Sequence, residues 1–540
     1  MSTRYSVGFD FGTESVRVVM VNVRDGTIAG QSSHTYAHGV LDRALPTGEK
    51  LPADYALQHP QDWLDDSASA CRDAIRIANV APEQIVGIGV AFTSCTMLPT
   101  LRDGTPLCTV DRFARTPLAW PKLWKHHGAK DATDRINQVA RQRSEPWLAR
   151  YGGSIGIEWF FPKILETLSD APEVYDATEV WIEAGDWFVW QLTGELTRST
   201  CQAGYKACWN RHSGFPSRDF FQAVHPKLAN VIAEKVPGTF NSPGRKSGGL
   251  SPAIANRFGL RAETPVSTAI IDAHAGVPGA GVASPSTMVM VIGTSSCHMM
   301  NSRIEALAPG IAGVVEDGIL PGYFGYETGQ ASVGDAFNAV VKLLGSSHET
   351  LSRQAAELPP GSNGVLALDW FNGCRTPLMD GRLSGAFLGM TLSTQPAQLY
   401  RATMEATAFG VRWICDTLRD AGVPVRRFVA SGGLPKKSPL LMQIYADVLD
   451  AKIRPAASDE PVALGAAILG ALAAGPDATG HASISQAIHA MAPRQHETIY
   501  RPDLRARKQY DELYKFYRQL AQNADVQSVM RCLRQSQSLS

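Results

Sequence analysis

Hydrophobic residues along the chain gather in short runs of valine, isoleucine, phenylalanine and methionine that end in glycine and small polar residues. The first segment, YSVGFDFGTESVRVVMVNV at residues 5–23, has two such runs with a Gly-containing turn between them. A looser copy of this pattern, TMVMVIGTSSCHMM, follows at residues 287–300. Each segment predicts a β-hairpin that opens a sheet. Their similarity favours two lobes that arose by duplication of one α/β unit.

Strand and helix patterns alternate between and after these hairpins. Residues 86–100 (VGIGVAFTSCTMLPT) predict a strand, and residues 93–96 near its small-residue end are candidates for a ligand pocket. Residues 158–194 predict helices whose tryptophans pack in the core. FVASGGLP at residues 428–435 predicts a strand and a double-glycine turn before a helix. ALGAAILGALAAG at residues 463–475 predicts a helix of small residues that suits close packing.

The length of 540 residues exceeds the about 250–300 residues at which a single hydrophobic core stops growing, so we expect two domains. Hydrophobic residues make up 44% and charged residues 19% of the chain, as in globular proteins. Lys+Arg and Asp+Glu both number 51, giving a formal net charge of +0. No basic field is therefore available to attract nucleic acid. A neutral molecule is also free to associate with other copies, which is compatible with a homodimer.

The nine cysteines are odd in number and scattered, without a C-x-x-C spacing. They predict neither a disulfide framework nor a zinc site, and they favour a reducing compartment. The N-terminal sequence MSTRYSVGFDFG lacks the features of a signal peptide. The small apolar run at residues 463–475 is shorter than the roughly 20 residues that cross a bilayer. We therefore expect a cytoplasmic protein that is not in a membrane.

The two hairpin turns are the first candidates for chemistry. Gly12–Ser15 and Gly293–Ser296 offer backbone N–H groups and hydroxyls to an anion, and facing each other across a cleft they would hold one polyphosphate. Neither turn is a Walker A or a G-x-G-x-x-G sequence, so a plain hairpin is an open alternative for each. Asp10, at the end of the first strand, is placed either to hold Mg²⁺ through water or to cap the turn.

Three further ionisable residues interrupt apolar surroundings. Asp272, in AIIDAHAGVPGAG, follows an apolar strand and precedes a Gly/Ala-rich helix. It is either a helix N-cap or a base that accepts a proton from a hydroxyl nucleophile. Lys206 and Glu327 lie in GYKACW and GYFGYETGQ, where a buried charge needs either a structural partner or a polar ligand.

Histidines at three positions have no spacing typical of a metal site. His274 and the pair His126-His127 offer no ligand triad at a recognised metal spacing, so we interpret them as surface residues or as residues behind a binding site.

The segment GAFLGMTLSTQPAQLYRATME at residues 385–405 resembles the C-terminal signature of the FGGY family of carbohydrate kinases. The resemblance extends from about residue 5 to about residue 475. The signature positions are Gly385, Gly389, Gln398, Ala402 and Glu405. Within the family the chain is most similar to the ribulokinases, in the segments DFGTES, FTSCTMLP, LWKHH, RYGGSIGIEWFFPKIL, WIEAGDW, AGYKACW, DAHAGVPGAG, VIGTSSCH, ETGQASVGDAF and LDWFNGCRTP.

This resemblance implies an α/β fold of two actin-like, ribonuclease-H-like ATPase domains with a cleft between them. The domain at residues 1–284 would bind the sugar and supply the catalytic base, and the domain at residues 285–540 would bind the nucleotide. The cleft would close around ATP, Mg²⁺ and a ketopentose. The implied reaction is ATP-dependent phosphorylation of the 5-hydroxyl of L-ribulose, a step of L-arabinose catabolism.

The resemblance also implies roles for single residues. Asp272 would be the general base on the sugar hydroxyl, and Asp10 would hold the magnesium. The other implied contacts are Ser94, Lys206 and Glu327 to the sugar, Thr13, Arg17, Thr294 and Ser295 to the phosphates, and Gly432, Gly433 and Leu434, with Lys437 nearby, to the adenosine.

One position departs from the pattern that the resemblance implies. The ribulokinase pattern at residues 90–93 would be Val-Asp-Phe-Thr, whereas this chain has alanine at position 91. The change is compatible with a shifted substrate, with weaker catalysis or with no effect. Alternatives to an L-ribulose kinase are therefore a family member acting on another ketose or polyol (D-ribulose, xylulose or sedoheptulose), an inactive sugar- or ATP-binding pseudokinase, and a nucleotide-dependent binding protein with the same fold.

Overall fold

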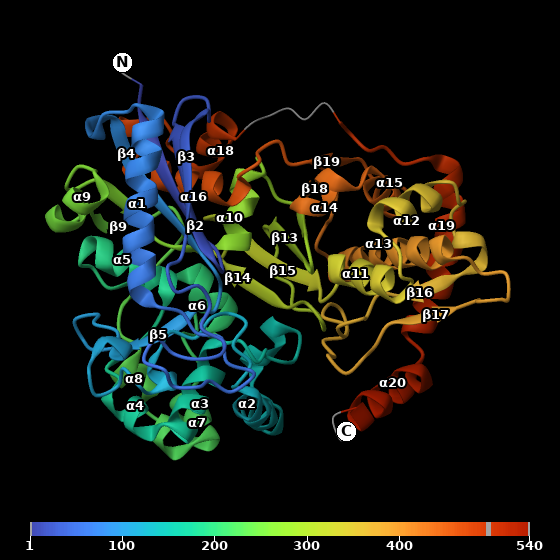
Figure 1. Cartoon of the computed structure of the whole chain (residues 1–540), viewed down its shortest axis with the longest axis horizontal. Helices are drawn as coiled ribbons and strands as arrows, with labels where there is room; N and C mark the ends of the chain where they lie inside the picture. The colour runs from blue at the N-terminus through green and yellow to red at the C-terminus, as the bar shows by residue number, and fades with distance from the viewer. Residues whose placement is uncertain (1–2, 493–497, 538–540) are drawn as a thin grey trace.

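The computed structural model describes residues 3–492 and 498–537, and Figure 1 shows two lobes, each built around a β-sheet. The N-terminal sheet has the strand order β3-β2-β1-β4-β10-β9, with β11 paired to β4. The predicted first hairpin is confirmed as β1 and β2. The strands of this sheet are β1 (Tyr5–Phe11), β2 (Ser15–Asn22), β3 (Ile28–Thr35), β4 (Ile85–Phe92), β9 (Lys246–Gly249), β10 (Pro265–Ser267) and β11 (Ile270–Ile271).

The C-terminal sheet repeats the same plan, with the order β14-β15-β13-β12-β18-β19. In both lobes three antiparallel strands are followed by a parallel one: β3-β2-β1-β4 in the first and β15-β13-β12-β18 in the second. This shared topology supports the predicted duplication. The strands are β12 (Thr287–Ile292), β13 (Ser296–Ser302), β14 (Gly313–Glu316), β15 (Phe324–Gln330), β18 (Arg427–Ser431) and β19 (Ile453–Pro455).

Helices cover both faces of the N-terminal sheet. One face packs against α1 (Pro60–Ala78), α5 (Ala184–Thr193) and α9 (Pro252–Phe258), in a core that contains Trp63 and Trp187. The other face packs against α10 (Asp272–Gly279), α16 (Pro461–Ala474) and α18 (Ile484–Met491), beside α17 (Pro476–Thr479). The cluster that holds α10 and α16 also includes residues of β12 and β13. These two helices therefore form a layer between the two sheets.

A mainly helical subdomain extends below the N-terminal sheet in Figure 1. It differs from the sequence prediction in two places. The strand predicted at residues 86–100 is divided, because Cys95 has a positive φ of 37° and breaks the extended chain. Residues 180–183 form a strand inside a segment predicted as helical. The elements are α2 (Lys130–Gln142), α3 (Phe160–Asp170), α4 (Pro172–Ala177), α6 (Thr200–Lys206), α7 (Arg218–Val224), α8 (Val231–Lys235), β5 (Met97–Thr100), β6 (Val180–Glu183), β7 (Thr197–Ser199) and β8 (Thr239–Asn241).

The C-terminal sheet packs its other face against long helices, and its core is the largest apolar cluster of the described residues. Helix α13 contains residues 396–405 of the signature segment, and the rest of that segment forms β17 and the loop before the helix. The elements are α11 (Gly334–Leu343), α12 (His348–Ala356), α13 (Pro396–Asp420), α14 (Gly433–Lys437), α15 (Pro439–Leu449), α19 (Leu504–Ala521), α20 (Ala524–Gln537), β16 (Leu366–Leu368) and β17 (Ala386–Leu388).

The predicted small-residue helix is confirmed as α16, and its neighbours explain its composition. A Cβ added to Gly89 of β4 would lie 1.7 Å from the Ala466 carbonyl oxygen. A Cβ on Gly279 of α10 would lie 1.7 Å from the Pro461 oxygen, and one on Gly465 would lie 1.8 Å from the Ala275 oxygen. Backbones thus touch where side chains would otherwise separate them. Although it comes late in the chain, α16 packs on the N-terminal sheet, so the two lobes are not two uninterrupted halves of the sequence.

Among residues 3–492 and 498–537, no single helix is long and apolar enough to cross a membrane. The pair Pro461–Ala474 and Pro476–Met491 passes the length and composition criteria only together, and it is bent by 116°.

We predict that Gly89→Ala lowers the free energy of unfolding by about 1–3 kcal/mol, because the new methyl group forces α16 away from β4. Chemical denaturation followed by circular dichroism measures the loss. The matched control is Gly381→Ala, where an added Cβ meets nothing within 4 Å. Equal stability of the two variants would contradict the close backbone contact.

Candidate functional site

The carboxyl ends of three parallel strands meet at one edge of the N-terminal sheet. Asp10 of β1 is in register with Ala91 of β4, and Ala91 is in register with Ile270 of β11. Helix α10 begins directly after β11, at Asp272. This edge is where α/β proteins bind ligands, and it places two carboxylates close together.

Asp10 lies in an unusual electrostatic position. Its Oδ2 is 3.3 Å from Arg17 Nη1, and the same Arg17 atom lies 3.0 Å from Glu460 Oε2. Burial, together with the nearby Asp272 and Glu460 carboxylates, outweighs Arg17 and raises the pKa of Asp10 to about 7. Arg17 is thus shared between two carboxylates, and the site has more negative charge than one guanidinium neutralises.

Asp272 occupies the first position of α10 rather than the N-cap, which is Ile271. Its Oδ1 accepts a hydrogen bond of 2.7 Å from the Ala273 N–H. Burial raises its pKa to about 6, although Ala273 and the charge of Lys206 oppose this rise. A carboxylate with a pKa near neutrality is suited to accept a proton.

Lys206 and Glu327, singled out separately by sequence, are partners across the two lobes. Lys206 Nζ, at the end of α6, donates to both carboxylate oxygens of Glu327 on β15 at 3.0 Å. Arg375 forms a further ion pair with the same carboxylate. Burial alone would raise the pKa of Glu327, but Lys206, Arg375 and His274 outweigh it and lower the pKa to about 2. Glu327 is therefore a fixed negative charge.

His274 lies behind this ion pair and is almost fully buried. Of its two interpretations, that of a surface residue is wrong, and its position agrees with that of a residue behind a binding site. Its Nε2 is 3.5 Å from Glu327 Oε2, and its ring packs against Tyr205 with centroids 4.4 Å apart. Burial lowers its pKa to about 4, so the ring is neutral at physiological pH. His126 is also buried, 2.9 Å from both oxygens of Glu166.

The loop after β4 brings Ser94 to the same region. Among the described residues, the buried Ser94 hydroxyl has no hydrogen-bond partner. Lys163 fixes this loop, because its Nζ donates to the Cys95 carbonyl oxygen at 2.5 Å and to the Leu123 carbonyl oxygen at 3.0 Å. An unsatisfied buried hydroxyl on a rigid loop is available to a polar ligand.

Ala91, where the resemblance implies an aspartate, is fully buried in the apolar cluster with α10 and α16. Because it is the in-register neighbour of Asp10, an acidic side chain at this position would stand beside Asp10. The departure therefore changes the surroundings of the Asp10 carboxylate.

The two hairpin turns are held by contacts from their own lobes. In the first, Trp124 Nε1 donates to Thr13 Oγ1 at 3.0 Å and Gln58 Nε2 donates to the Thr13 carbonyl oxygen at 2.8 Å. In the second, the backbone N–H groups of Val333 and Asp335 donate to the Thr294 carbonyl oxygen at 2.8 and 3.1 Å. Thr294 and Ser295 are exposed. Both turns thus present hydroxyls from ordered backbone.

A cavity of about 320 Å³ lies between the lobes, lined mainly by small residues and prolines. Gly432 and Gly433 line it, as do Ala273 and Gly276 of α10. The φ of Gly432 is 98°, and a Cβ there would lie 2.6 Å from the Ile292 oxygen. A mainly apolar ligand group fits a cavity with this lining.

The other two residues assigned to this part of the site lie outside the cavity lining. Leu434 packs against the C-terminal core, and Lys437 is exposed. The lysine that lines the cavity is Lys436, whose Nζ is 2.6 Å from Asp459 Oδ1.

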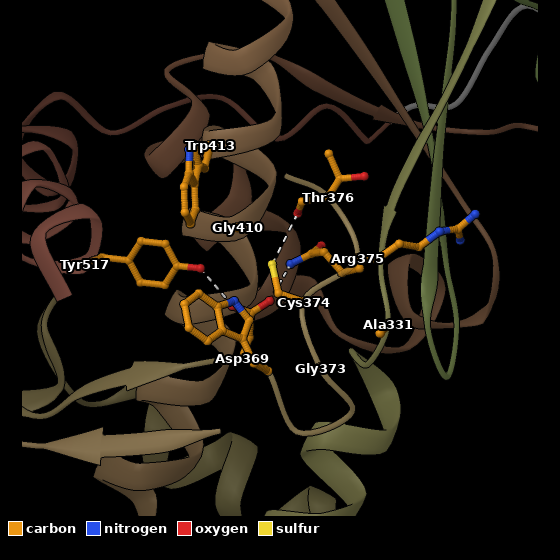
Figure 2. Close-up of a pocket in the computed structure, with 11 residues that line it drawn as sticks. Ala331, Asp369, Gly373, Cys374, Arg375, Thr376, Gly410, Trp413 and Tyr517 are labelled. Carbon is orange, nitrogen blue, oxygen red and sulfur yellow. Dashed lines mark hydrogen bonds between the residues drawn. The ribbon is translucent and has the colours of Figure 1, made fainter. Parts of the chain in front are cut away.

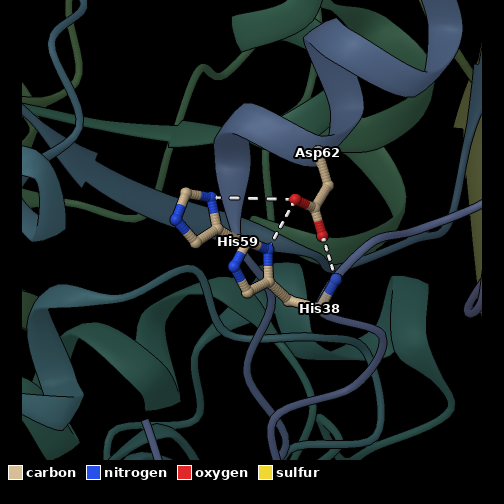
Figure 3. Close-up of side chains that lie close together, drawn as sticks. All are labelled: His38, His59 and Asp62. Carbon is tan, nitrogen blue, oxygen red and sulfur yellow. Dashed lines mark hydrogen bonds and ion pairs between the residues drawn. The ribbon is translucent and has the colours of Figure 1, made fainter. Parts of the chain in front are cut away.

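A cluster that sequence reasoning did not find, His38, His59 and Asp62, lies at the start of α1 (Figure 3). Asp62 Oδ1 is 2.7 Å from His38 Nδ1, and the two imidazoles are stacked, 4.3 Å apart and 12° from parallel. A metal ion lies close to the plane of each imidazole that binds it, and two stacked rings have no such point in common. This arrangement suits a hydrogen-bonded cap of the helix better than a metal centre.

Two other residues of the site escaped sequence reasoning, Arg375 and Glu460. In the sequence, each is a single charged residue without a distinctive local pattern, and charged residues of this kind are common on protein surfaces. Their contacts join positions far apart in the chain, so no local spacing could have identified them.

Two family models match the chain. The FGGY family of carbohydrate kinases, N-terminal domain, matches residues 5–279, and the C-terminal domain of the same family matches residues 288–474. The chain is 43% identical to a ribulokinase from Bacillus licheniformis, over 97% of this chain and 98% of the relative. It is 45% identical to a ribulokinase from Mycolicibacterium smegmatis, over 87% of this chain and 86% of the relative.

Solved structures show the same fold. A xylulose kinase from Rhodospirillum rubrum matches with a TM-score of 0.77 and 24% identity, over 96% of this chain and 98% of the other. A glycerol kinase from Plasmodium falciparum with ADP matches with a TM-score of 0.76 and 15% identity, over 96% and 99%. The predicted two-domain α/β architecture is confirmed by these neighbours.

We predict that Asp272→Asn stabilises the folded chain at pH 8. Since the pKa of Asp272 rises from 3.8 to about 6 on folding, the folded state binds more protons between these values, and ionisation above pH 6 costs stability. Asparagine removes this cost, an expected gain of about 1–2 kcal/mol at pH 8. The gain should shrink as the pH falls toward 4.

Urea unfolding at pH 8 and pH 4.5 measures this difference. Asp219→Asn, which changes an exposed aspartate in the first turn of α7, is the control and should alter stability little at either pH. A gain for Asp272→Asn that is absent at pH 8, or equal at the two pH values, would contradict the raised pKa.

Proposed function

Because the chain belongs to the FGGY family of carbohydrate kinases, we propose that it transfers the terminal phosphoryl group of ATP to the 5-hydroxyl of a ketopentose. L-Ribulose is the proposed substrate, since the relatives that are about 43% identical over nearly the whole chain are ribulokinases. The product would be L-ribulose 5-phosphate, formed in the cytoplasm during L-arabinose catabolism. The neutral net charge is compatible with a homodimer, and a measurement of the mass in solution tests this.

The placement of helix α10 carries this proposal. Its first residue, Asp272, interacts electrostatically with Lys206 and Glu327, while Ala273 and Gly276 of the same helix line the cavity of about 320 Å³. One short helix therefore joins the charged side chains of Lys206 and Glu327 to the cavity. A sugar in the pocket and a nucleotide in the cavity would meet at the Asp272 carboxylate.

The proposed chemistry follows from these positions. Asp272 accepts the proton of the sugar 5-hydroxyl, and the oxygen of that hydroxyl forms a bond to the terminal phosphorus of ATP. The bond from that phosphorus to ADP breaks, and ADP retains the electron pair. Phosphoryl transfer depends mainly on positioning and on neutralising charge, so Lys206, Glu327 and the Ser94 hydroxyl orient the sugar while Thr13, Thr294 and Ser295 contact the phosphates.

The Asp10 carboxylate is suited to bind a cation. It is crowded by Asp272 and Glu460 and has a pKa raised to about 7, so a nearby positive charge would favour its ionised form. We propose that Asp10 holds Mg²⁺ through water, which supplies positive charge to the phosphates when bound. Arg17, now shared by Asp10 and Glu460, would then be free to contact a phosphate.

The direct test is ATP-dependent phosphorylation across L-ribulose, D-ribulose, L-xylulose, D-xylulose, sedoheptulose and glycerol, with magnesium present and with it chelated. We expect a preference for L-ribulose that is lost on chelation. Activity on another sugar alone would keep the carbohydrate kinase activity and replace L-ribulose as the proposed substrate. Absence of turnover with every sugar would overturn the proposal in favour of a binding protein.

We predict that Asp272→Asn lowers kcat at least about a hundredfold, the usual contribution of a general base. The kcat/KM of the unsubstituted enzyme for the sugar should fall below a pH of about 6, where Asp272 becomes protonated. Steady-state kinetics from pH 5 to pH 9 measure both. Because the same substitution is expected to stabilise the fold at pH 8, a loss of activity cannot be attributed to unfolding; an unchanged kcat would exclude Asp272 as the base.

A further inference from the structure

Glu327 is held by one cation from each lobe. Lys206 belongs to α6 of the N-terminal lobe, and Arg375 belongs to the segment between β16 and β17 of the C-terminal lobe. The two side chains share Glu327 Oε1, and Lys206 also donates to Oε2 at 3.0 Å. The Arg375 guanidinium makes a second contact in its own lobe, since its Nη1 is 3.6 Å from Cys297 Sγ, just after the second hairpin turn.

Arg375 is fixed in place by the segment that carries it. The Thr376 N–H donates to the Gly329 carbonyl oxygen at 3.1 Å, and Thr376 Oγ1 accepts from the Gly329 N–H at 3.3 Å. These bonds attach the segment to the end of β15, two residues beyond Glu327. The cation and the carboxylate are therefore held by neighbouring backbone.

A second anchor lies at the other end of the segment. Asp369 is buried and accepts hydrogen bonds from Tyr517 at 2.9 Å and from Gln330 Nε2 at 2.8 Å. Figure 2 shows Asp369 and Tyr517 beside a small cavity, which Gln330 also lines, and it shows the Arg375 side chain extending away from that cavity. The segment is thus tied to α19 on one side and presents Arg375 to Glu327 on the other.

The two cations differ in how readily they leave Glu327. Lys206 is a flexible point charge on the opposite lobe, whereas the arginine fork is planar and attached to the same lobe as Glu327. Lys206 contacts both Glu327 oxygens, so a sugar hydroxyl that binds Glu327 either shares an oxygen with Lys206 or displaces it. With Arg375 in place, the carboxylate keeps a counter-charge when Lys206 turns toward the sugar. Without Arg375, Lys206 is the remaining close cation for a buried carboxylate, and separating them becomes costly.

We propose that Arg375 is a positioning residue for the sugar site, which holds Glu327 in place and thereby frees Lys206 to bind the ketose. This inference rests on the proposed function and deepens it, because it assigns a role in sugar affinity to a residue that does not itself contact the reacting atoms.

The test is steady-state kinetics of Arg375→Met and Arg375→Lys with L-ribulose and ATP. For Arg375→Met we expect the KM for L-ribulose to rise about ten- to a hundredfold, while kcat and the KM for ATP change less than about threefold. Arg375→Lys keeps the charge and should recover a large part of the sugar affinity. Calorimetric titration with L-ribulose in the absence of ATP should show the same order of affinities.

Arg382→Met is the matched control. Arg382 lies in the same segment, is 60% exposed and pairs with Asp380, so its loss should leave both KM values unchanged. A double-mutant cycle with Glu327→Gln gives a second control. Since the inferred effect passes through Glu327, adding Arg375→Met to Glu327→Gln should raise the sugar KM little further.

Three results would overturn the inference. The first is a sugar KM for Arg375→Met within twofold of that of the unsubstituted enzyme. The second is a fall in kcat that accompanies equal rises in both KM values and a lowered melting temperature, and the third is an undiminished effect of Arg375→Met in the Glu327→Gln background. These outcomes leave the proposed function standing if the unsubstituted enzyme phosphorylates L-ribulose. Failure of the unsubstituted enzyme with every ketose would instead remove the proposed function and, with it, this inference.

Discussion

The contact between α10 and α16 determines where the reacting groups of this protein lie. The helices meet through glycines, at distances where even a methyl group would overlap a carbonyl oxygen. Because backbone touches backbone, there is no side chain whose rotation could absorb a shift. Asp272 at the start of α10 and Glu460 just before α16 are therefore fixed relative to Asp10 on the sheet beneath them.

Three carboxylates in this cleft have different proton affinities for physical reasons that the structure makes plain. Two cations and a histidine lower the pKa of Glu327 to about 2, whereas burial raises that of Asp272 to about 6 and that of Asp10 to about 7. One group is thus a permanent charge, one is poised to exchange a proton, and one favours a nearby cation. Such separation of pKa values is how a single site assigns different roles to the same chemical group.

The two lobes are linked electrically as well as sterically. Lys206 from one lobe and Arg375 from the other share the Glu327 carboxylate. Within the N-terminal lobe, Arg17 of the first hairpin pairs with Glu460, the residue just before α16. Charges that face the cleft are therefore already paired with one another. Substrates that carry hydroxyls and phosphates would therefore replace existing ion-pair partners instead of binding to unpaired charges.

Local patterns in the sequence were sufficient for the two hairpins, for the helix of small residues and for the position of Asp272 at a helix start, since each depends on neighbouring residues. The strand at residues 180–183 was missed because its apolar run is equally typical of a helix, and pairing with β5 decided it. The resemblance to a family indicated Lys206 and Glu327, but their pairing, the sharing of Glu327 with Arg375 and the return of α16 to the N-terminal sheet appeared only in the tertiary structure. The two Glu327 contacts join residues 48 and 121 positions apart, and the hydrogen bond from Ser6 of β1 to Ala467 of α16 joins residues 461 positions apart. Such distant partners are chosen by how the whole chain packs, which no local spacing records.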